Sequence, residues 1–263
     1  MGYGESAPRD ELRPFVEAIW TMTSRADPAT AGRGTILPDG AAEIVVSCGD
    51  PIAIPPRRRL QRRVLLGPSD RVRRVIYAGA VDLVGVRLRP GVVRAMVNVP
   101  LARLVNRIVP LGSVAPSLDA KLAEGVASAG ASGKRPDAMQ RVIESFTRQT
   151  TPPDGFFTRA IDAIRAQQGR IRIDDLASRL GVSRRHLERE FLANIGLSPK
   201  RWCRVIRFQC AVESMPMSKI RYWPSPARLA SYIAASAFAI SVSASRPWSG
   251  NSVTPRLAVM LIT

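Results

Sequence analysis

The chain has 263 residues, enough for about two domains of ordinary size. Lysine and arginine total 39 against 21 acidic residues, a formal net charge of +18, and such an excess favours a polyanionic partner, of which nucleic acid is the commonest. Three cysteines without a CxxC spacing and a single histidine exclude a disulfide framework and argue against a structural zinc site. The composition therefore predicts a protein of a reducing, cytoplasmic setting, with no metal and no cofactor.

An arginine-rich composition offers a second explanation for the charge. Only four of the basic residues are lysine, as expected where a GC-rich genome favours arginine codons. The charge alone therefore indicates a nucleic-acid partner without establishing one.

Residues 1–115 are predicted to form a β-rich input domain. The segment "TILPDGAAEIVVSCGD" holds a Pro-Asp-Gly turn followed by a strand-like run, Glu43 to Cys48. Later segments, "RRVLLGPSD", "RVRRVIYAG" and "VDLVGVRLRPG", each place β-branched or aromatic residues beside glycine or proline. No GxGxxG, GxxxxGK[ST] or GxSxG motif occurs in this part of the sequence, and we expect no catalysis from it.

Two arginines at the end of this region are candidates for contact with a ligand. Within "GVRLRPG", Arg87 and Arg89 alternate along the predicted strand and so share one face of it. If that face lines a cavity, the two guanidinium groups are suited to hold an anionic small-molecule effector. If it faces water, they are ordinary surface charges.

Residues 116–155 are predicted to be a helical linker region. A helix rich in small residues begins at Pro116, and "ASGKRPD" interrupts it. The segment "DAMQRVIESFTRQT" then spaces apolar residues at helical intervals, and "TPPDG" breaks the chain again at Thr151 to Gly155. We therefore place the start of a separate helical domain, 156–263, after this break.

The segment "DDLASRLGVSRRHLEREF" has the pattern of a helix-turn-helix. Its first helix turns Leu176, Ala177 and Leu180 inward, and Gly181 can adopt the positive φ of a sharp turn. Ser183 can then cap the second helix by accepting hydrogen bonds from amides two and three residues later. This order of small residue, glycine and hydroxyl cap predicts two helices that meet at a corner.

The second helix, Arg184–Ala193, presents a polar face suited to DNA. Arginine bonds guanine O6 and N7 in bidentate fashion, and glutamate accepts from cytosine N4. The alternative is a plain helical hairpin whose polar face meets water. Residues 156–222 hold 14 basic and 6 acidic side chains, which favours the DNA-binding reading. His186 is expected to pack or to contact phosphate, because no carboxylate or thiol lies at a spacing that would activate it as a base.

These residues also resemble a known family. Ile171 to Val212 is similar to the first half of an AraC/XylS-type DNA-binding domain, through "S-x-x-H-L-x-R-x-F" from Ser183 to Phe191 and "G-x-S-P" from Gly196 to Pro199. The N-terminal part resembles an uncharacterised domain found in a subset of these bacterial transcriptional regulators, through "LPDGAAEIVVSCGD", "LLGP", "VGVRLRPG" and "VPL". The resemblance implies a transcription factor whose N-terminal part senses and whose C-terminal part binds DNA.

The resemblance also assigns residue roles and partners. It places Arg185, Glu188 and Arg189 at base-facing positions of the recognition helix, and Ser183 and Arg184 at positions that contact the DNA backbone; with His186 as a phosphate contact, these residues form the predicted site. The implied partner is double-stranded DNA, with RNA polymerase and an unidentified small-molecule effector as further candidates. The function predicted from the sequence is therefore sequence-specific regulation of transcription.

The last part of the chain departs from the family pattern. Residues 156–213 match well, but residues 214–263 lack the Gly-aromatic turn and the "D-x-S-x-F-x-R-x-F" helix of a second helix-turn-helix. Only "ARLA" and "SVTP" echo it, and no acidic residue follows Glu213. Two hypotheses are a degenerate second motif and a reading frame shifted near residues 214–228, which the coding DNA would test. The uncharged run from Leu229 to Ser245 is too short and too rich in serine to span a membrane, for which about 20 apolar residues are needed, so no membrane partner is expected.

Two alternatives to a specific transcription factor stay open. A degenerate family member with one recognition helix loses about half of its base and phosphate contacts and would bind DNA only non-specifically. A DNA-repair enzyme carrying this helical domain would need a reactive cysteine in an acceptor motif and a cysteine-rich zinc cluster, and the sequence has neither.

Overall fold

The structure is a computed structural model of the chain. It describes residues 2–24, 32–54, 59–77, 79–130, 132–148, 150–153, 155–214 and 261–262. The sequence predictions for a degenerate or frame-shifted second helix-turn-helix, and for the uncharged run from Leu229 to Ser245, fall almost wholly within residues 215–260, outside the described residues.

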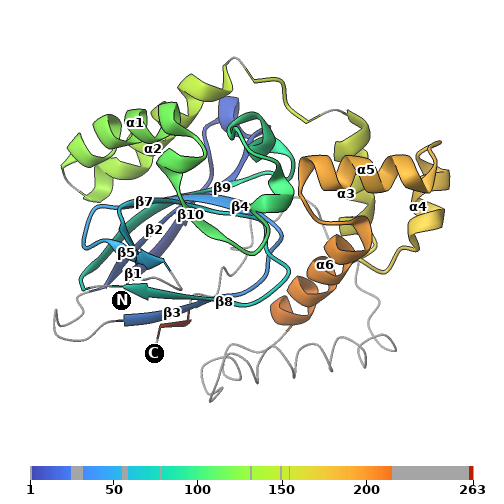
Figure 1. The fold of residues 1–263 in the computed structure, drawn as a ribbon, viewed down its shortest axis with the longest axis horizontal. Helices are drawn as coiled ribbons and strands as arrows, with labels where there is room; N and C mark the ends of the chain where they lie inside the picture. The colour runs from blue at the N-terminus through green and yellow to red at the C-terminus, as the bar shows by residue number, and fades with distance from the viewer. Residues whose placement is uncertain are drawn as a thin grey trace.

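The N-terminal part of the chain forms two antiparallel sheets that face each other (Figure 1). The first sheet has, in spatial order, β1 (Gly2–Ser6), β2 (Val16–Ser24), β9 (Val81–Leu88), β4 (Ala42–Ser47), β7 (Arg63–Leu66) and β10 (Ile108–Pro110). The second sheet has β11 (Leu261–Ile262), β3 (Gly32–Ile36), β8 (Arg73–Tyr77), β5 (Ile52–Ile54) and β6 (Arg59–Gln61). The strand expected at Glu43 to Cys48 is β4.

The first sheet separates two hydrophobic cores because successive side chains point to opposite faces of a strand. On β4, Ile44 and Val46 join the core beneath the helices, whereas Val45 joins the core between the sheets. The same alternation on β9 places Val84 and Val86 toward the helices and Val81 and Leu83 between the sheets, while on β2 Trp20 and Met22 also lie between the sheets. Both faces of the sheet are therefore buried.

Two helices cover the outer face of the first sheet (Figure 1). They are α1 (Pro116–Gly125) and α2 (Arg135–Thr147), and they follow the short 3-10 turns η2 (Val92–Ala95) and η3 (Leu101–Arg103). Leu118, Leu122 and Met139 are almost fully buried in one core with the strands. Within the segment 116–155, which we expected to be a helical linker, α1 and α2 pack as a layer of the β-rich unit.

Four further helices make a second unit with its own core. They are α3 (Gly155–Ala166), α4 (Ile173–Arg179), α5 (Arg184–Asn194) and α6 (Pro199–Glu213). The apolar stripe of α3 contributes Phe157, Ala160, Ile161 and Ile164 to this core, as its helical spacing predicts. The expected α+β class, a β-rich N-terminal part followed by a helical part, is confirmed.

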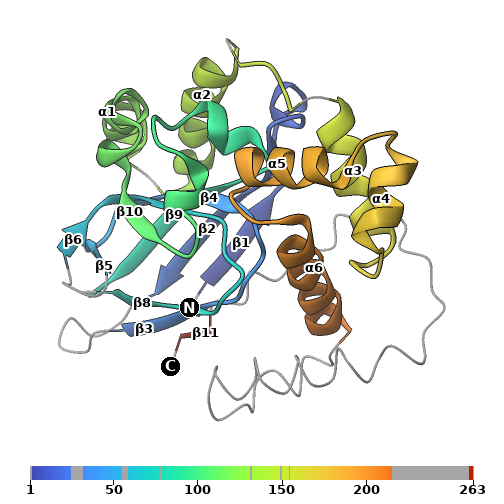
Figure 2. The same cartoon turned by 45° about the vertical axis from the view of Figure 1, so that its right-hand side comes forward.

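The helical unit lies directly against the β-rich unit, with α6 beside the open end of the two sheets (Figure 2). The Arg201 side chain donates to Asp70 at 2.7 Å, and Arg165 forms an ion pair with Glu17. Trp202 packs over Gly40, where a side chain would overlap its ring. None of the helices in the described part of the chain is long and apolar enough to cross a membrane.

Candidate nucleic-acid interface

The corner between α4 and α5 is built as the sequence predicts. Gly181 has a φ of +68°, in the left-handed region that favours glycine, and the Val182 amide donates to the Ala177 carbonyl at 3.0 Å. Ser183 is the N-cap of α5, and its hydroxyl accepts from the His186 amide at 3.2 Å. The cap bond reaches the amide three residues later, one of the two amides expected.

The buried face of α5 fixes its orientation on the unit. Leu187 and Phe191 are fully buried, and the Phe191 ring meets the Phe157 ring edge to face with 5.4 Å between centroids. The helix therefore presents its opposite face outward, which holds the residues expected to contact bases.

The three predicted base-facing residues are brought together on that outward face. Arg185 is exposed and makes no hydrogen bond or ion pair with another described residue, and the Arg189 side chain is 69% exposed. Glu188 accepts from Arg184 Nε at 3.0 Å, and Arg184 also reaches Asp174 of α4 at 3.2 Å. The hydrogen bond to Glu188, and then the charge of Asp174, raise the pKa of Arg184.

Arg184 therefore joins the two helices of the motif at their surface. Its partner Asp174 lies in the first turn of α4. The sequence pattern of one helix does not show which residues of the next helix lie beside it, so this ion pair was not predicted. The ion pair also holds the Glu188 carboxylate toward the N-terminal end of α5.

His186 has two contacts on the same helix end. Its ring lies 5.4 Å from the Phe156 ring, and its Nδ1 is 2.7 Å from Arg189 Nη2. Because guanidinium nitrogens only donate, Nδ1 is the acceptor in this pair. His186 therefore packs against α3 and accepts a hydrogen bond from Arg189.

The C-terminal end of α5 is covered by the β-rich unit, whereas the N-terminal end is not. Asn194 lies 3.4 Å from Arg94 of η2, and a Cβ on Gly196 would come within 2.8 Å of the Leu101 carbonyl of η3. Figure 2 shows the C-terminal end of α5 beside the 3-10 turns and α4 near its N-terminal end. The half of the helix that carries Arg185 and Arg189 is therefore open to a partner.

The outward face of α5 also holds an apolar residue, Leu192, that was not predicted from the sequence. Leu192 is 47% exposed and is one of few large apolar side chains of the described chain in that state. It follows Glu188 by four residues and Arg185 by seven, and this spacing places all three on one side of α5. Helical periodicity predicts the position of Leu192 on this face, but only the charged residues of the face were considered in the sequence analysis.

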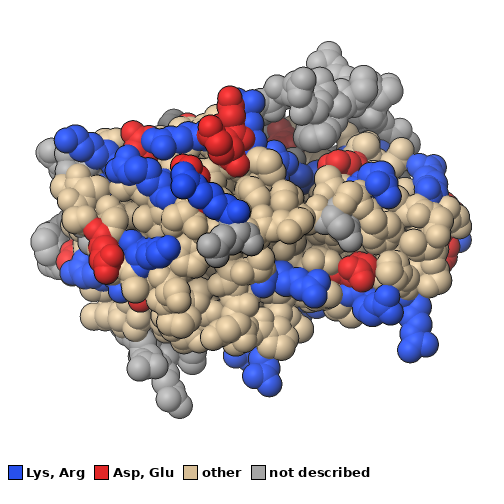
Figure 3. Space-filling view, turned by 90° about the horizontal axis from the view of Figure 1, so that it is seen from above, with Lys and Arg blue, Asp and Glu red and all other residues tan. Residues whose placement is uncertain are grey.

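Basic side chains surround this face. Arg170, Arg172 and Arg179, near α4, and Lys200 and Arg204 of α6 are all exposed. Figure 3 shows lysine and arginine side chains projecting from the end of the molecule that holds α3 to α5, with a few acidic side chains between them. Such a surface is suited to a phosphate backbone.

The two arginines proposed to hold an effector lie in different environments. Arg87 is 3% exposed, and its Nε donates to Glu43 at 2.8 Å. Burial lowers the pKa of Arg87, but the carboxylates of Glu43, Asp39 and Glu5 outweigh it and raise the value. Arg89 follows the end of β9, is exposed, and donates from Nε to the Arg13 carbonyl. The Arg87 guanidinium group is therefore paired with buried carboxylates, whereas that of Arg89 lies at an exposed position and donates to a main-chain carbonyl.

Two of the three cysteine thiols are harder to deprotonate than a free thiol, which lowers their reactivity. Burial raises the pKa of Cys203 to about 11 and also raises the pKa of Cys48. Within the described residues no three histidine, cysteine or acidic side chains are grouped so as to hold a metal ion.

Comparisons with known proteins find one family model that matches the N-terminal part of the chain. A family model described as a domain of unknown function (DUF6597) matches residues 4–110, the part of the chain in which an uncharacterised domain was expected. No curated protein sequence matches the chain. Among solved structures, the chain is similar to ToxT from Vibrio cholerae, with a TM-score of 0.42 and 11% identity over 90% of this chain and 94% of that chain. It is also similar to unsaturated fatty acid bound ToxT from the same organism (TM-score 0.38, 11% identity, 82% and 84% covered) and to the AraC-like transcriptional activator CuxR (0.22, 14%, 75% and 73%).

Proposed function

We propose that this chain is a sequence-specific DNA-binding transcription regulator of AraC/XylS type, which reads a major groove with α5. The observation that supports this most directly is the exposed N-terminal half of α5, where Arg185 and Arg189 extend from a capped and packed helix. Double-stranded DNA is its partner, and RNA polymerase is the machinery whose action it changes. An unidentified small molecule is its effector.

The geometry of this face supports a separate proposed role for each of its residues. Arg185 has no other described partner and Arg189 is largely exposed, so both guanidinium groups are available to guanine O6 and N7. Glu188, held by Arg184, is placed to accept from cytosine N4. Ser183 and His186 stand at the N-terminus of the helix, where amides and the helix dipole favour a phosphate.

A gel-shift titration tests the proposal with the full chain. The probes are its own upstream DNA and unrelated duplexes of the same length, each across a series of salt concentrations. Arg189→Ala should weaken binding to the upstream DNA by about 10- to 100-fold, the cost of one bidentate base contact, and weaken binding to unrelated DNA much less. The matched control is Arg141→Ala, which removes the same charge from an exposed position of α2.

Three results would contradict the proposal. Equal loss on all duplexes would make Arg189 a phosphate contact, and equal affinity of the unaltered chain for all duplexes would favour non-specific binding. Equal effects of Arg189→Ala and Arg141→Ala would show that only net charge matters.

A further inference from the structure

A cavity lies between the two sheets, and none of the residues that line it belongs to the proposed DNA-binding surface. It is partly open to solvent, and its empty volume of about 550 Å3 includes that open part. Both sheets contribute to it: Trp20, Val64 and Leu83 come from the first sheet, and Ile52 and Val75 from the second. The walls are therefore mainly apolar, as in sites that enclose small organic molecules.

Three polar side chains of the first sheet line the cavity: Tyr3 of β1, Trp20 of β2 and Glu43 of β4. The Tyr3 hydroxyl donates to Glu5 at 2.8 Å. Glu43 is the only charged residue among the described residues that line the cavity, and it is 6% exposed. Trp20 also lines it, and its indole N–H, though buried, has no hydrogen-bond partner among the described residues. Gly85 of β9 lies between their strands, and because it has no side chain the indole can lie across β9 toward β4. The cavity wall therefore offers the Glu43 carboxylate as a charged acceptor and the Trp20 N–H as a donor without a described partner.

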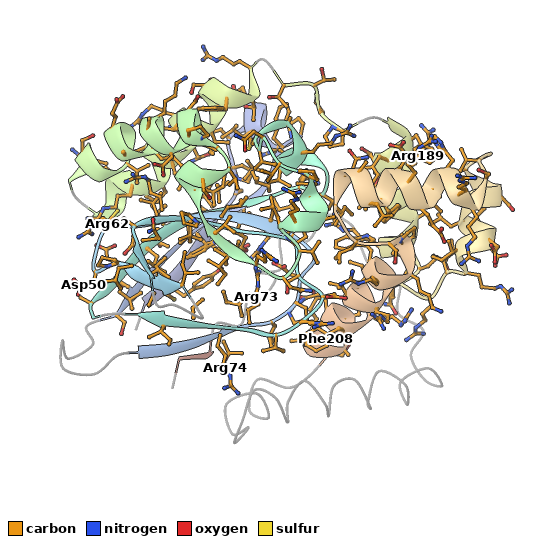
Figure 4. The ribbon with its side chains drawn as sticks, viewed as in Figure 1. Asp50, Arg62, Arg73, Arg74, Arg189 and Phe208 are labelled. Carbon is orange, nitrogen blue, oxygen red and sulfur yellow. The ribbon has the colours of Figure 1, made fainter. Side chains whose placement is uncertain are left out.

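Glu43 belongs to a buried cluster of charged side chains whose positive and negative charges nearly cancel. This balance bears on the charge of a ligand that binds beside it. The buried guanidinium groups of Arg87 and Arg73 lie in one cluster with the carboxylates of Glu43, Asp39 and Glu5. Figure 4 shows Arg73 in the space between the sheets, whereas its neighbour Arg74 points away from it. Burial, and then repulsion from Glu43, raise the pKa of Asp39 to about 7, so a proton offsets part of the acidic excess.

A charged ligand would disturb this balance. A carboxylate would add a further negative charge beside Glu43 in a poorly solvated place, and an ammonium group would leave the Trp20 N–H unsatisfied because it can only donate. A hydroxyl group can satisfy both polar groups of the wall without adding a charge. It donates its hydrogen to Glu43, and its oxygen accepts from the Trp20 N–H.

We propose that this cavity binds an uncharged amphipathic molecule, with an alkyl or aryl body against the apolar walls and a hydroxyl group between Glu43 and the Trp20 N–H. This site does not depend on DNA binding, so it can exist whether or not α5 reads a major groove.

Three probes with the same eight-carbon chain test the ligand class by isothermal titration of the full chain: octan-1-ol, octanoate and octylammonium. The alcohol should bind most tightly. Trp20→Phe keeps an aromatic body but removes the N–H, and should weaken alcohol binding about 3- to 10-fold, the effect of one hydrogen bond. Trp202→Phe is the matched control, because Trp202 also has a buried indole N–H without a described partner but does not line the cavity. It should leave the affinity unchanged.

A second variant keeps the test decisive if Trp20→Phe does not fold. Ile108 lines the cavity from β10 and is only half-buried, so Ile108→Trp can fill the space with little strain and should abolish binding of the alcohol. Tighter binding of octanoate or octylammonium would overturn the proposed class. Absence of binding for all three probes, or equal effects of Trp20→Phe and Trp202→Phe, would overturn the site.

Discussion

Arg201 Nε donates to Asp70 Oδ2 at 2.7 Å and so ties α6 to the segment that joins β7 and β8. The Asp70 side chain is 7% exposed, also accepts from Asn106 at 2.9 Å, and has Arg204 at 3.7 Å. The unit that carries α5 is therefore held to the β-rich unit by a charged contact, and its strength depends on the ionisation of Asp70.

Asp70→Asn should lower the free energy of unfolding at neutral pH by about 1 to 3 kcal/mol, because Arg201 loses its charged acceptor. The hydrogen bond from Arg201 lowers the pKa of Asp70 below its ordinary value of about 3.9. A carboxylate whose pKa is lower in the folded state contributes stability that is complete above the unfolded value and is lost as the pH falls through the folded value. The difference between the two proteins in urea unfolding should therefore be full at pH 7 and shrink below about pH 4.

Asp137→Asn is the control for this prediction. Asp137 pairs with Arg9 at 3.1 Å, but its side chain is 58% exposed, so its loss should have little effect on the free energy of unfolding. An equal effect of the two substitutions at pH 7 would show that the contact between the units contributes no more than a surface ion pair.

Asp39→Asn should have the opposite dependence on pH. The pKa of Asp39 is about 7 in the folded protein, against about 3.9 for an unfolded chain. As the pH rises from about 4 to 7, the unfolded chain releases this proton before the folded protein does, so Asp39 progressively lowers the free energy of unfolding. The variant should therefore gain stability relative to the unaltered protein across this range, and the difference should stay constant above it. A difference in urea unfolding that does not change between pH 4 and pH 7 would refute the buried position of this carboxyl group.

The helix-turn-helix could be predicted from the sequence because its signals are local. Gly181 and Ser183 act on residues within four positions of themselves, and the predicted helix Arg184–Ala193 agrees with α5 to within one residue. The outward face followed from the same periodicity. Leu192 was not predicted to belong to this face, because only charged side chains were expected to contact DNA.

The environment of Arg87 could not be predicted because its partners are distant in the sequence. Glu43 lies opposite Arg87 on the neighbouring strand, and that register is set by the pairing of β4 with β9. Arg89 was assigned to the same face by alternation, but β9 ends at Leu88, before the alternation reaches it. Likewise, the apolar spacing of α1 and α2 predicted helices without showing that the outer face of the first sheet would be their partner.

Ser183→Ala should destabilise α5 through the loss of its N-cap. The hydroxyl accepts from the His186 amide at 3.2 Å, and replacing such a cap by alanine costs about 1 kcal/mol. Ser178→Ala is the matched control, because Ser178 is exposed within α4 and alanine has the better helix propensity there. Urea unfolding should show a loss for Ser183→Ala and none for Ser178→Ala, and equal curves would mean that the cap contributes nothing.

Gly196→Ala should cost more stability than Gly181→Ala, although both glycines have a positive φ, +82° and +68°. Each substitution places a Cβ in the left-handed region, at a cost of about 1 kcal/mol. At Gly181 nothing lies within 4 Å of that Cβ, whereas at Gly196 it would lie 2.8 Å from the Leu101 carbonyl oxygen. Only Gly196→Ala must therefore also push α5 away from η3, which should increase proteolysis between the two units as well as lower the free energy of unfolding. Equal costs for the two variants would show that α5 is not held against η3 in solution.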